Sequence, residues 1–180
     1  TLFANREFFE GKTTLLVHAD NWCRCDLGEF MAFHRHRRPV GCPVTMMTFD
    51  TPTPETCGIV ETDSTGVVLE FHEKVADPPG NHANGAVYLL EPEVLSWLAL
   101  RPDATDFSTD VLPDFLGRIA TWHNSGIHLD IGTPEMLALA QQDPAPVRVQ
   151  TEVDEWSDWF SDHPVHRQVA DLTVACDPTP

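Results

Sequence analysis

The chain has 180 residues, the length of a single domain, and 42% of them are hydrophobic, which is enough for one core. Its 28 acidic residues outnumber the 11 Lys and Arg residues, and the formal net charge of −17 disfavours nucleic acid and anionic lipid as partners. Because no apolar run approaches the ~20 residues of a membrane span and no signal-peptide pattern is present, a soluble, cytoplasmic protein is predicted.

The first part of the chain predicts strands and a helix in alternation. Leu15–Ala19 is a short apolar run that suits a buried strand ending at Asp20. Asp26–Arg38 has apolar residues at helical spacing, with Asp26 as the N-cap. Val44–Phe49 is predicted as a second buried strand.

The rest of the chain continues this alternation. Strands or apolar runs are predicted at Gly58–Glu61, Val67–Phe71, Gly85–Leu90, Ile119–His123 and Ile127–Leu129. Helices are predicted at Pro92–Leu100, Asp110–Arg118 and Pro134–Gln142, the last with Thr133 as its N-cap. This order predicts an α/β domain over residues 1–142. The Pro-rich stretch at 143–146 marks the boundary to a C-terminal extension, residues 143–180, which is expected to be partly helical with a disordered end.

Two aspartates stand directly after apolar runs. Asp20 follows the first predicted strand, and Asp130 follows Ile127–Leu129. Because ligands bind outside the carboxyl ends of strands in open α/β sheets, these two side chains are candidates to meet. Mg²⁺ prefers carboxylate and phosphate oxygens and is the expected cofactor. A turn former or a helix cap is the alternative interpretation of each aspartate.

Glu73 and Lys74 form an acidic–basic pair at the end of another strand. Lys74 offers a compact positive charge for a phosphate, and Glu73 offers an acceptor for sugar hydroxyls. An ordinary surface ion pair is the alternative interpretation.

Several segments taken together carry a family resemblance. They are LLVHADN (15–21), TMMTFDTP (45–52), CGIVETDSTGVVLEFHEKV (57–75), NGAVYLLEPEVL (84–95), DFSTDVLPDFLGRI (106–119) and HLDIGTPEMLALA (128–140). Their order and spacing resemble the sugar-1-phosphate nucleotidyltransferases, and most of all the mannose-1-phosphate and heptose-1-phosphate guanylyltransferase branch. The resemblance covers about residues 13–142. It implies a Rossmann-like, three-layer α/β fold with a mixed, mostly parallel sheet, here incomplete at the N-terminus.

The resemblance implies catalytic roles for three residues. Asp20 and Asp130 match the two aspartates that hold the metal, and Lys74 matches the lysine that contacts the phosphate of the sugar phosphate.

Four further positions match substrate-binding residues of the family. Glu73 matches the glutamate that binds sugar hydroxyls, and Gly58 matches a glycine whose backbone lies against the sugar. Asn84 and Gly85 fall in the strand that closes the sugar pocket.

The chain departs from the family pattern at three places. Val75 stands where Pro commonly follows the Glu–Lys pair, and Ala86 stands where the family usually has Gly. Nothing in Thr1–Thr14 resembles the glycine-rich loop that cradles the triphosphate, so no residue is assigned to the triphosphate or to the base.

The implied reaction transfers a nucleotidyl group from an NTP, GTP by branch resemblance, to a sugar 1-phosphate. Its products are pyrophosphate and an NDP-sugar for cell-surface polysaccharide synthesis. The expected partners are these two substrates. Whether the protein forms a homo-oligomer is left open, with residues 147–180 as a candidate interface. Two alternatives are a non-catalytic regulatory or assembly subunit and a metal-dependent glycosyltransferase.

Zinc binding by Cys23, Cys25, His34 and His36 is a disfavoured alternative. His34 and His36 are two positions apart on a predicted helix, so they point in different directions. The odd number of cysteines, five, and their spacing predict reduced thiols rather than a disulfide framework.

Overall fold

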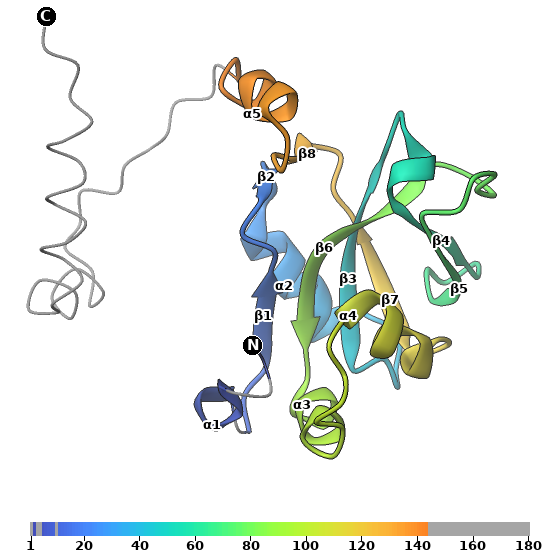
Figure 1. The fold of residues 1–180 in the computed structure, drawn as a ribbon. Coiled ribbons are helices and arrows are strands. Elements are labelled where there is room, and N and C mark those ends of the chain that lie inside the picture. Colours follow the sequence, from blue (N-terminus) through green and yellow to red (C-terminus); the bar gives the residue numbers. More distant parts are fainter. Residues whose placement is uncertain (1, 3–4, 10, 144–180) are drawn as a thin grey trace, which may run out of the picture. The chain divides into compact units, whose positions relative to one another are not determined.

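A computed structural model describes residue 2, residues 5–9 and residues 11–143 (Figure 1). The helices are α1 (Arg6–Phe9), α2 (Leu27–His36), α3 (Pro92–Ala99), α4 (Phe107–Asp110) and α5 (Pro134–Ala140), with 3₁₀ helices η2 (Pro54–Thr56) and η3 (Leu112–Phe115). The strands are β1 (Thr14–Val17), β2 (Asn21–Cys23), β3 (Val44–Asp50), β4 (Gly58–Thr62), β5 (Val68–Glu73), β6 (His82–Leu90), β7 (Ile119–His123) and β8 (His128–Asp130). None of the helices described is both long enough and apolar enough to cross a bilayer. The C-terminal extension was predicted for residues 143–180. From position 144 onward it lies outside the described residues.

The central sheet is mixed, in the order β5-β4-β6-β3-β7, with β1 also paired to β6. The expectation of a mixed α/β fold is confirmed, but the expectation that the sheet is mostly parallel is wrong for the described strands. Only β3 and β7 run parallel, whereas β1, β3 and β4 pair antiparallel with β6, and β4 pairs antiparallel with β5. Connection length explains the pairing of β4 with β5: residues 63–67 join these two strands and are shorter than the crossover of about a dozen residues that parallel neighbours need.

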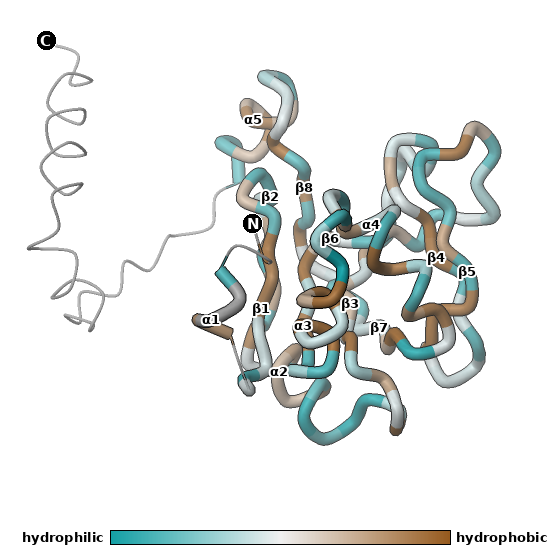
Figure 2. The backbone as a smooth tube through the Cα atoms, turned by 60° about the horizontal axis from the view of Figure 1, so that its bottom comes forward, coloured by the Kyte–Doolittle hydropathy of each residue, from teal (hydrophilic) through white to brown (hydrophobic). Residues whose placement is uncertain are grey.

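Helices cover both faces of this sheet, which confirms the three layers. On one face Phe30 of α2 packs against Met47, and on the other Met46 packs in a cluster with Leu98 of α3 and Phe115 of η3. Met46 and Met47 are adjacent and both fully buried because successive strand residues point to opposite faces. Figure 2 shows apolar residues (brown) along strands such as β1 and β4. Each such buried side chain stabilises the fold by about 1.5–3 kcal/mol.

A bulge divides β6 into two halves. Tyr88 pairs with Met46 but Asn84 pairs with Thr48, so β6 holds extra residues between two ladder positions. Ala86 lies in this bulge with a φ of 52°, a left-handed conformation that glycine adopts more easily. The bulge is where β6 changes partner along one edge, from β4 before it to β1 after it. It therefore brings the end of β1 beside the first half of β6.

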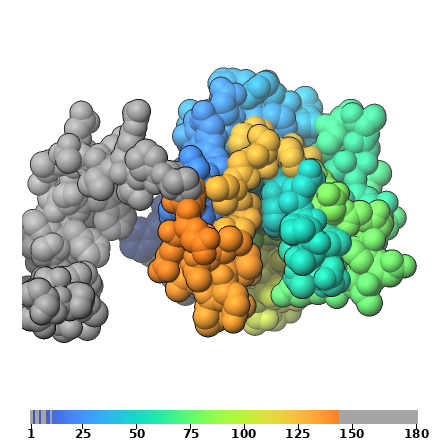
Figure 3. Space-filling model, turned by 90° about the horizontal axis from the view of Figure 1, so that it is seen from above, coloured from blue at the N-terminus to red at the C-terminus, as the bar shows by residue number. Residues whose placement is uncertain are grey.

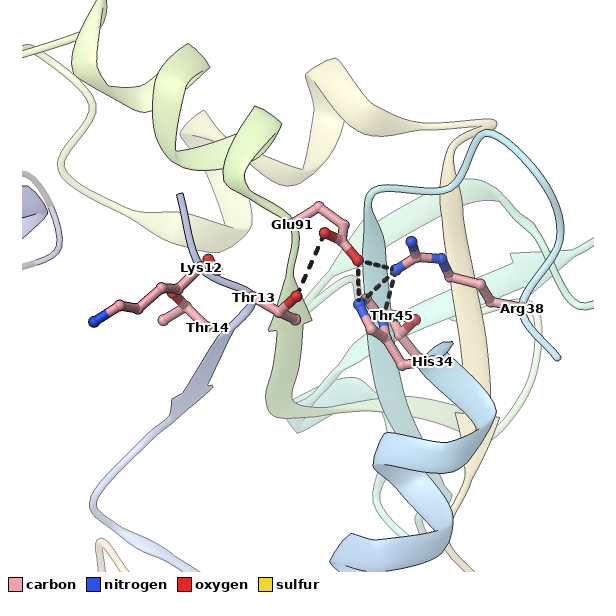
Figure 4. Close-up of polar contacts among 7 residues, drawn as sticks. All are labelled: Lys12, Thr13, Thr14, His34, Arg38, Thr45 and Glu91. Carbon is pink, nitrogen blue, oxygen red and sulfur yellow. Dashed lines mark hydrogen bonds and ion pairs between the residues drawn. The ribbon is translucent and has the colours of Figure 1, made fainter. Parts of the chain in front are cut away.

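A buried polar network fastens α2 to the sheet (Figure 4). The His34 side chain is only 2% exposed, with Nε2 2.9 Å from Oε1 of Glu91 and Nδ1 2.7 Å from the hydroxyl of Thr45. An ionised Glu91 accepts from Nε2–H, so Nδ1 accepts from the hydroxyl of Thr45. Arg38 lies 2.8 Å from the same Glu91 oxygen. Both ring nitrogens of His34 are thus engaged in a structural network.

Most local predictions are confirmed, including both N-caps. The Asp26 side chain accepts from the amide of Glu29 at 2.9 Å, and Thr133 accepts from the amide of Met136 at 3.2 Å.

Two predicted features differ from the structure, and one strand was not predicted. The strand predicted as buried, β1, has Leu15 43% and Val17 47% exposed, because these two residues project from the same face of β1 and that face is left partly open. The helix predicted at Asp110–Arg118 is instead α4 followed by η3. It breaks there because Pro113 lacks an amide hydrogen and cannot continue an α-helical ladder. Strand β2 was not predicted.

Candidate functional site

The two candidate metal-binding aspartates lie at neighbouring backbone positions. Asn21 of β2 pairs with Asp130 of β8, and the amide of Ile131 donates to the carbonyl oxygen of Asp20 at 2.7 Å. Both aspartates are exposed, and Oδ1 of Asp130 accepts from the amide of Gly132 at 2.8 Å. Two exposed carboxylates at neighbouring backbone positions offer oxygen ligands of the kind that a hard cation such as Mg²⁺ prefers.

Strand β2 is held in place from both sides. The side-chain amide of Asn21 donates to the carbonyl oxygen of Gly85 in the β6 bulge at 3.0 Å. The Asp143 side chain, only 3% exposed, accepts from the indole of Trp22 at 3.2 Å and from Arg24 at 3.0 Å. These contacts fix the segment that follows Asp20.

Gly85 lies where a larger residue does not fit. A Cβ there would stand 3.0 Å from the carbonyl oxygen of Met47 and 3.2 Å from Cε1 of His128. The His128 ring stacks on Phe49 with centroids 4.2 Å apart. Its Nδ1 is buried and has no hydrogen-bond partner among the described residues, and burial lowers the pKa of His128, opposed in part by Asp130. A neutral imidazole therefore supports the strand that ends in Asp130.

The Glu–Lys pair lies against Gly58. Gly58 and Glu73 are paired across β4 and β5, and a Cβ on Gly58 would stand 2.8 Å from Oε2 of Glu73 and 2.5 Å from Cζ of Phe71. Lys74 has a φ of 50°, and its amide donates to the carbonyl oxygen of Cys57 at 3.2 Å. A non-glycine residue in this conformation costs of order 1 kcal/mol and marks a sharp turn where β5 ends. The Lys74 ammonium is exposed and lies 3.8 Å from Oε1 of Glu73.

The side chain of Asn84 is engaged within the protein. Its amide nitrogen donates to the hydroxyl of Tyr88 at 2.7 Å, and its carbonyl oxygen accepts from the amide of Ala86 at 3.0 Å. Burial raises the pKa of Tyr88, and hydrogen bonds from Asn84 and Ser108 oppose this shift. Asn84 therefore helps to hold the β6 bulge in which Gly85 lies.

A groove of about 820 Å³ runs beside Asp20. Residues 17–20 line one part of it, and Thr105, Asp106 and Ser108 line another. A second hollow of about 1040 Å³ is lined by Cys23, Trp122 and Asn124 among others and includes none of the predicted site residues.

The two groups of predicted residues lie along one path through the sheet. The aspartates stand at one end and Lys74 at the other. The links between them are Asn21–Gly85, Ala83–Ile59 and Gly58–Glu73. Figure 3 looks onto the end of the molecule that carries the aspartates. Segments near residues 20–25 (blue), 124–130 (yellow to orange) and 50–57 (teal) lie together there. Sequence reasoning assigns no role to Asn21 or Tyr88, because nothing local reveals that their partners are Gly85 and Asn84.

Comparison with known proteins gives concordant results. The profile of the family "Nucleotidyl transferase" matches residues 1–145. "Glucose-1-phosphate adenylyltransferase" of Desulfitobacterium hafniense (strain Y51) is 27% identical over 138 residues, which are 71% of this chain and 34% of the relative. "Probable mannose-1-phosphate guanylyltransferase 3" of Arabidopsis thaliana is 28% identical over 128 residues, 69% of this chain and 37% of the relative. The chain thus spans about a third of the length of these two relatives.

A solved structure shares the fold. It is described as "a Putative Glucose-1-Phosphate Thymidylyltransferase from Bacillus anthracis in Complex with a Sucrose". It superposes with a TM-score of 0.64 at 20% identity, over 77% of this chain and 57% of the other. The family profile spans the whole described domain, and the structural match reproduces its architecture. The chain belongs to the Nucleotidyl transferase family.

Proposed function

We propose that the protein containing this chain transfers a nucleotidyl group from an NTP to a sugar 1-phosphate. An oxygen of the sugar phosphate attacks the α-phosphorus, the new phosphoanhydride bond forms, and pyrophosphate leaves with the electron pair of the broken bond. The attacking oxygen is already anionic, so the protein has to position and neutralise charge rather than remove a proton. The observation that supports this proposal is that Asp20 and Asp130, which are far apart in the sequence, lie at neighbouring backbone positions.

In this proposal, metal-binding residues lie at one end of the site and sugar-phosphate-binding residues at the other. Asp20 and Asp130 would hold Mg²⁺, whose charge screens the phosphates of the two substrates from each other. Lys74 contacts the phosphate of the sugar phosphate, and Glu73 accepts hydrogen bonds from sugar hydroxyls. Gly58 leaves room for the Glu73 carboxylate because it has no side chain.

The finer assignments rest on resemblance. GTP is favoured because the order and spacing of the sequence segments resemble the guanylyltransferase branch, and the product then serves cell-surface polysaccharide synthesis in the cytoplasm. The relatives above bear the names of an adenylyl- and a guanylyltransferase, so the base has to be tested directly. The test is pyrophosphate release by the full-length protein with a panel of NTPs and sugar 1-phosphates. GTP with mannose or heptose 1-phosphate is expected to give the highest kcat/KM.

Asp130→Asn in the full-length protein should lower kcat by a factor of about 10² or more, because one metal-binding carboxylate loses its charge. The thermal midpoint should change little because Asp130 is exposed. Asp103→Asn, at another exposed position, is the matched control and should keep full activity. Turnover of the Asp130 variant near the unsubstituted level would remove this residue from the mechanism. A folded protein without turnover on any substrate pair would favour the non-catalytic alternative.

A further inference from the structure

Three strands of the central sheet end in side chains that can bind a metal ion. Asp50 ends β3, His82 begins β6 and His123 ends β7. The register pairs Asp50 with His82 and Thr48 with His123. Because Thr48 and Asp50 are two positions apart on one strand, all three side chains project from the same face.

The ligand atoms of these residues lie close together. Nδ1 of His82 is 3.7 Å from Oδ1 of Asp50, and Nε2 of His123 is 4.0 Å from Oδ2 of the same residue. One ligand atom from each residue can be chosen so that all lie within 4.8 Å of one another. The two imidazole rings stack with centroids 5.3 Å apart. Tetrahedral ligands at about 2.0–2.1 Å from a metal are about 3.4 Å apart, so small side-chain rotations close the site. Asp50 and His123 are exposed, which leaves room for such rotations.

We propose that Asp50, His82 and His123 form a binding site for a borderline divalent transition metal such as Zn²⁺, Co²⁺ or Ni²⁺. Two imidazoles and one carboxylate suit these ions, whereas Mg²⁺ prefers oxygen ligands alone. A bound ion would cross-link three strands at their ends, and water would complete its coordination. This site is independent of the two aspartates in the proposed reaction.

A second group, Glu61, Glu70 and His72, provides an internal comparison. It has a single imidazole, and Nε2 of His72 already lies 2.8 Å from Oε1 of Glu61. This direct hydrogen bond engages the histidine without a metal, so the group serves as the control.

The test is calorimetric titration of the full-length chain, without an affinity tag, with Zn²⁺ after removal of bound metal. His82→Asn and His123→Asn should each lower Zn²⁺ affinity at least tenfold, and His72→Asn should leave it unchanged. Zn²⁺ should also raise the thermal midpoint of the unsubstituted protein but not that of the His82 and His123 variants. The same midpoints measured without metal show that the variants fold.

Co²⁺ provides a spectroscopic check. The site should give d–d absorption without the intense thiolate-to-cobalt charge-transfer bands that cysteine ligands produce. Zn²⁺ affinity that persists in both histidine variants but is lost in a His163→Asn/His166→Asn variant would overturn the proposal. Thiolate bands or an absence of Zn²⁺ binding would overturn it as well.

Discussion

At the scale of single residues, two glycines decide how closely the site can be packed. Gly58 lies against the carboxylate of Glu73, and Gly85 lies against the backbone of Met47 and the ring of His128. A side chain at either position would have to displace its neighbours. Backbone freedom is not the reason, because neither glycine adopts a positive φ.

Gly58→Ala in the full-length protein should raise the KM for the sugar 1-phosphate about tenfold or more, because the added methyl group displaces the Glu73 carboxylate. Gly80→Ala is the matched control, since nothing lies within 4 Å of a Cβ at that position. Steady-state kinetics of both variants, with thermal midpoints, test this. An unchanged KM in the Gly58 variant would contradict the role given to Glu73.

His34 makes stability depend on pH. Burial, and then the charge of Arg38, lowers the pKa of His34 below its ordinary value of 6.5, and burial likewise lowers the pKa of His82 and His128. The unfolded chain therefore binds protons that the folded chain excludes. The free energy of unfolding should be greatest above about pH 6.5 and should fall as the pH decreases below it.

His34→Gln should lower the free energy of unfolding by about 1–3 kcal/mol near neutral pH, because buried partners lose a hydrogen bond. It should also reduce the further loss between about pH 7.5 and about pH 5.5. Denaturant unfolding at several pH values measures both effects. His36→Gln, on the exposed side of the same helix, should change neither. A steeper pH dependence in the His34 variant would be the opposite of this expectation.

At the scale of elements, the β6 bulge is the feature that assembles the site. It lets one strand pair with β4 near the Glu–Lys pair and with β1 near the first aspartate. The amide of His18 donates to the carbonyl oxygen of Ala86 at 3.2 Å, and Asn21 donates to Gly85. The loop carrying Asp20 is therefore bonded to the bulge itself.

Ala86→Gly should stabilise the protein by about 0.5–1 kcal/mol, because glycine relieves the left-handed strain at a φ of 52°. Ala83→Gly, three positions earlier in the same strand and fully buried, should destabilise it by about 1 kcal/mol or more. Denaturant unfolding of the two variants compares them directly. A loss of stability in both would mean that Ala86 carries little strain.

At the scale of the whole molecule, charge opposes the proposed substrates. A net charge of −17 repels phosphorylated ligands over distances comparable with the Debye length, about 10 Å at 0.1 M salt. The two exposed aspartates of the site add to this repulsion until a cation binds them. The sheet, by contrast, owes its stability to a three-layer apolar core.

Raising the NaCl concentration from about 20 mM to about 150 mM at fixed free Mg²⁺ should increase kcat/KM for the sugar 1-phosphate, by about twofold. Salt screens the long-range repulsion more than it screens the short contacts within the site. Initial rates at low substrate concentration measure this effect. A steady decrease of kcat/KM with salt would indicate that local attraction to Lys74 outweighs the net charge.

The sequence by itself determined the local features and the order of the candidate residues. The N-caps Asp26 and Thr133 were predictable because a cap is a contact within one turn of chain. The positions of Asp20 and Asp130 after apolar runs were also visible in the sequence.

Tertiary structure decided which distant segments meet. The antiparallel direction of most pairings, the exposed edge of β1 and the pairing of β2 with β8 depend on strand register. So does the convergence of Asp50, His82 and His123, which have no shared spacing along the chain. The physical reason is that hydrogen bonds between strands are nearly alike at every residue, so packing of the whole sheet, and not any local pattern, selects the partner.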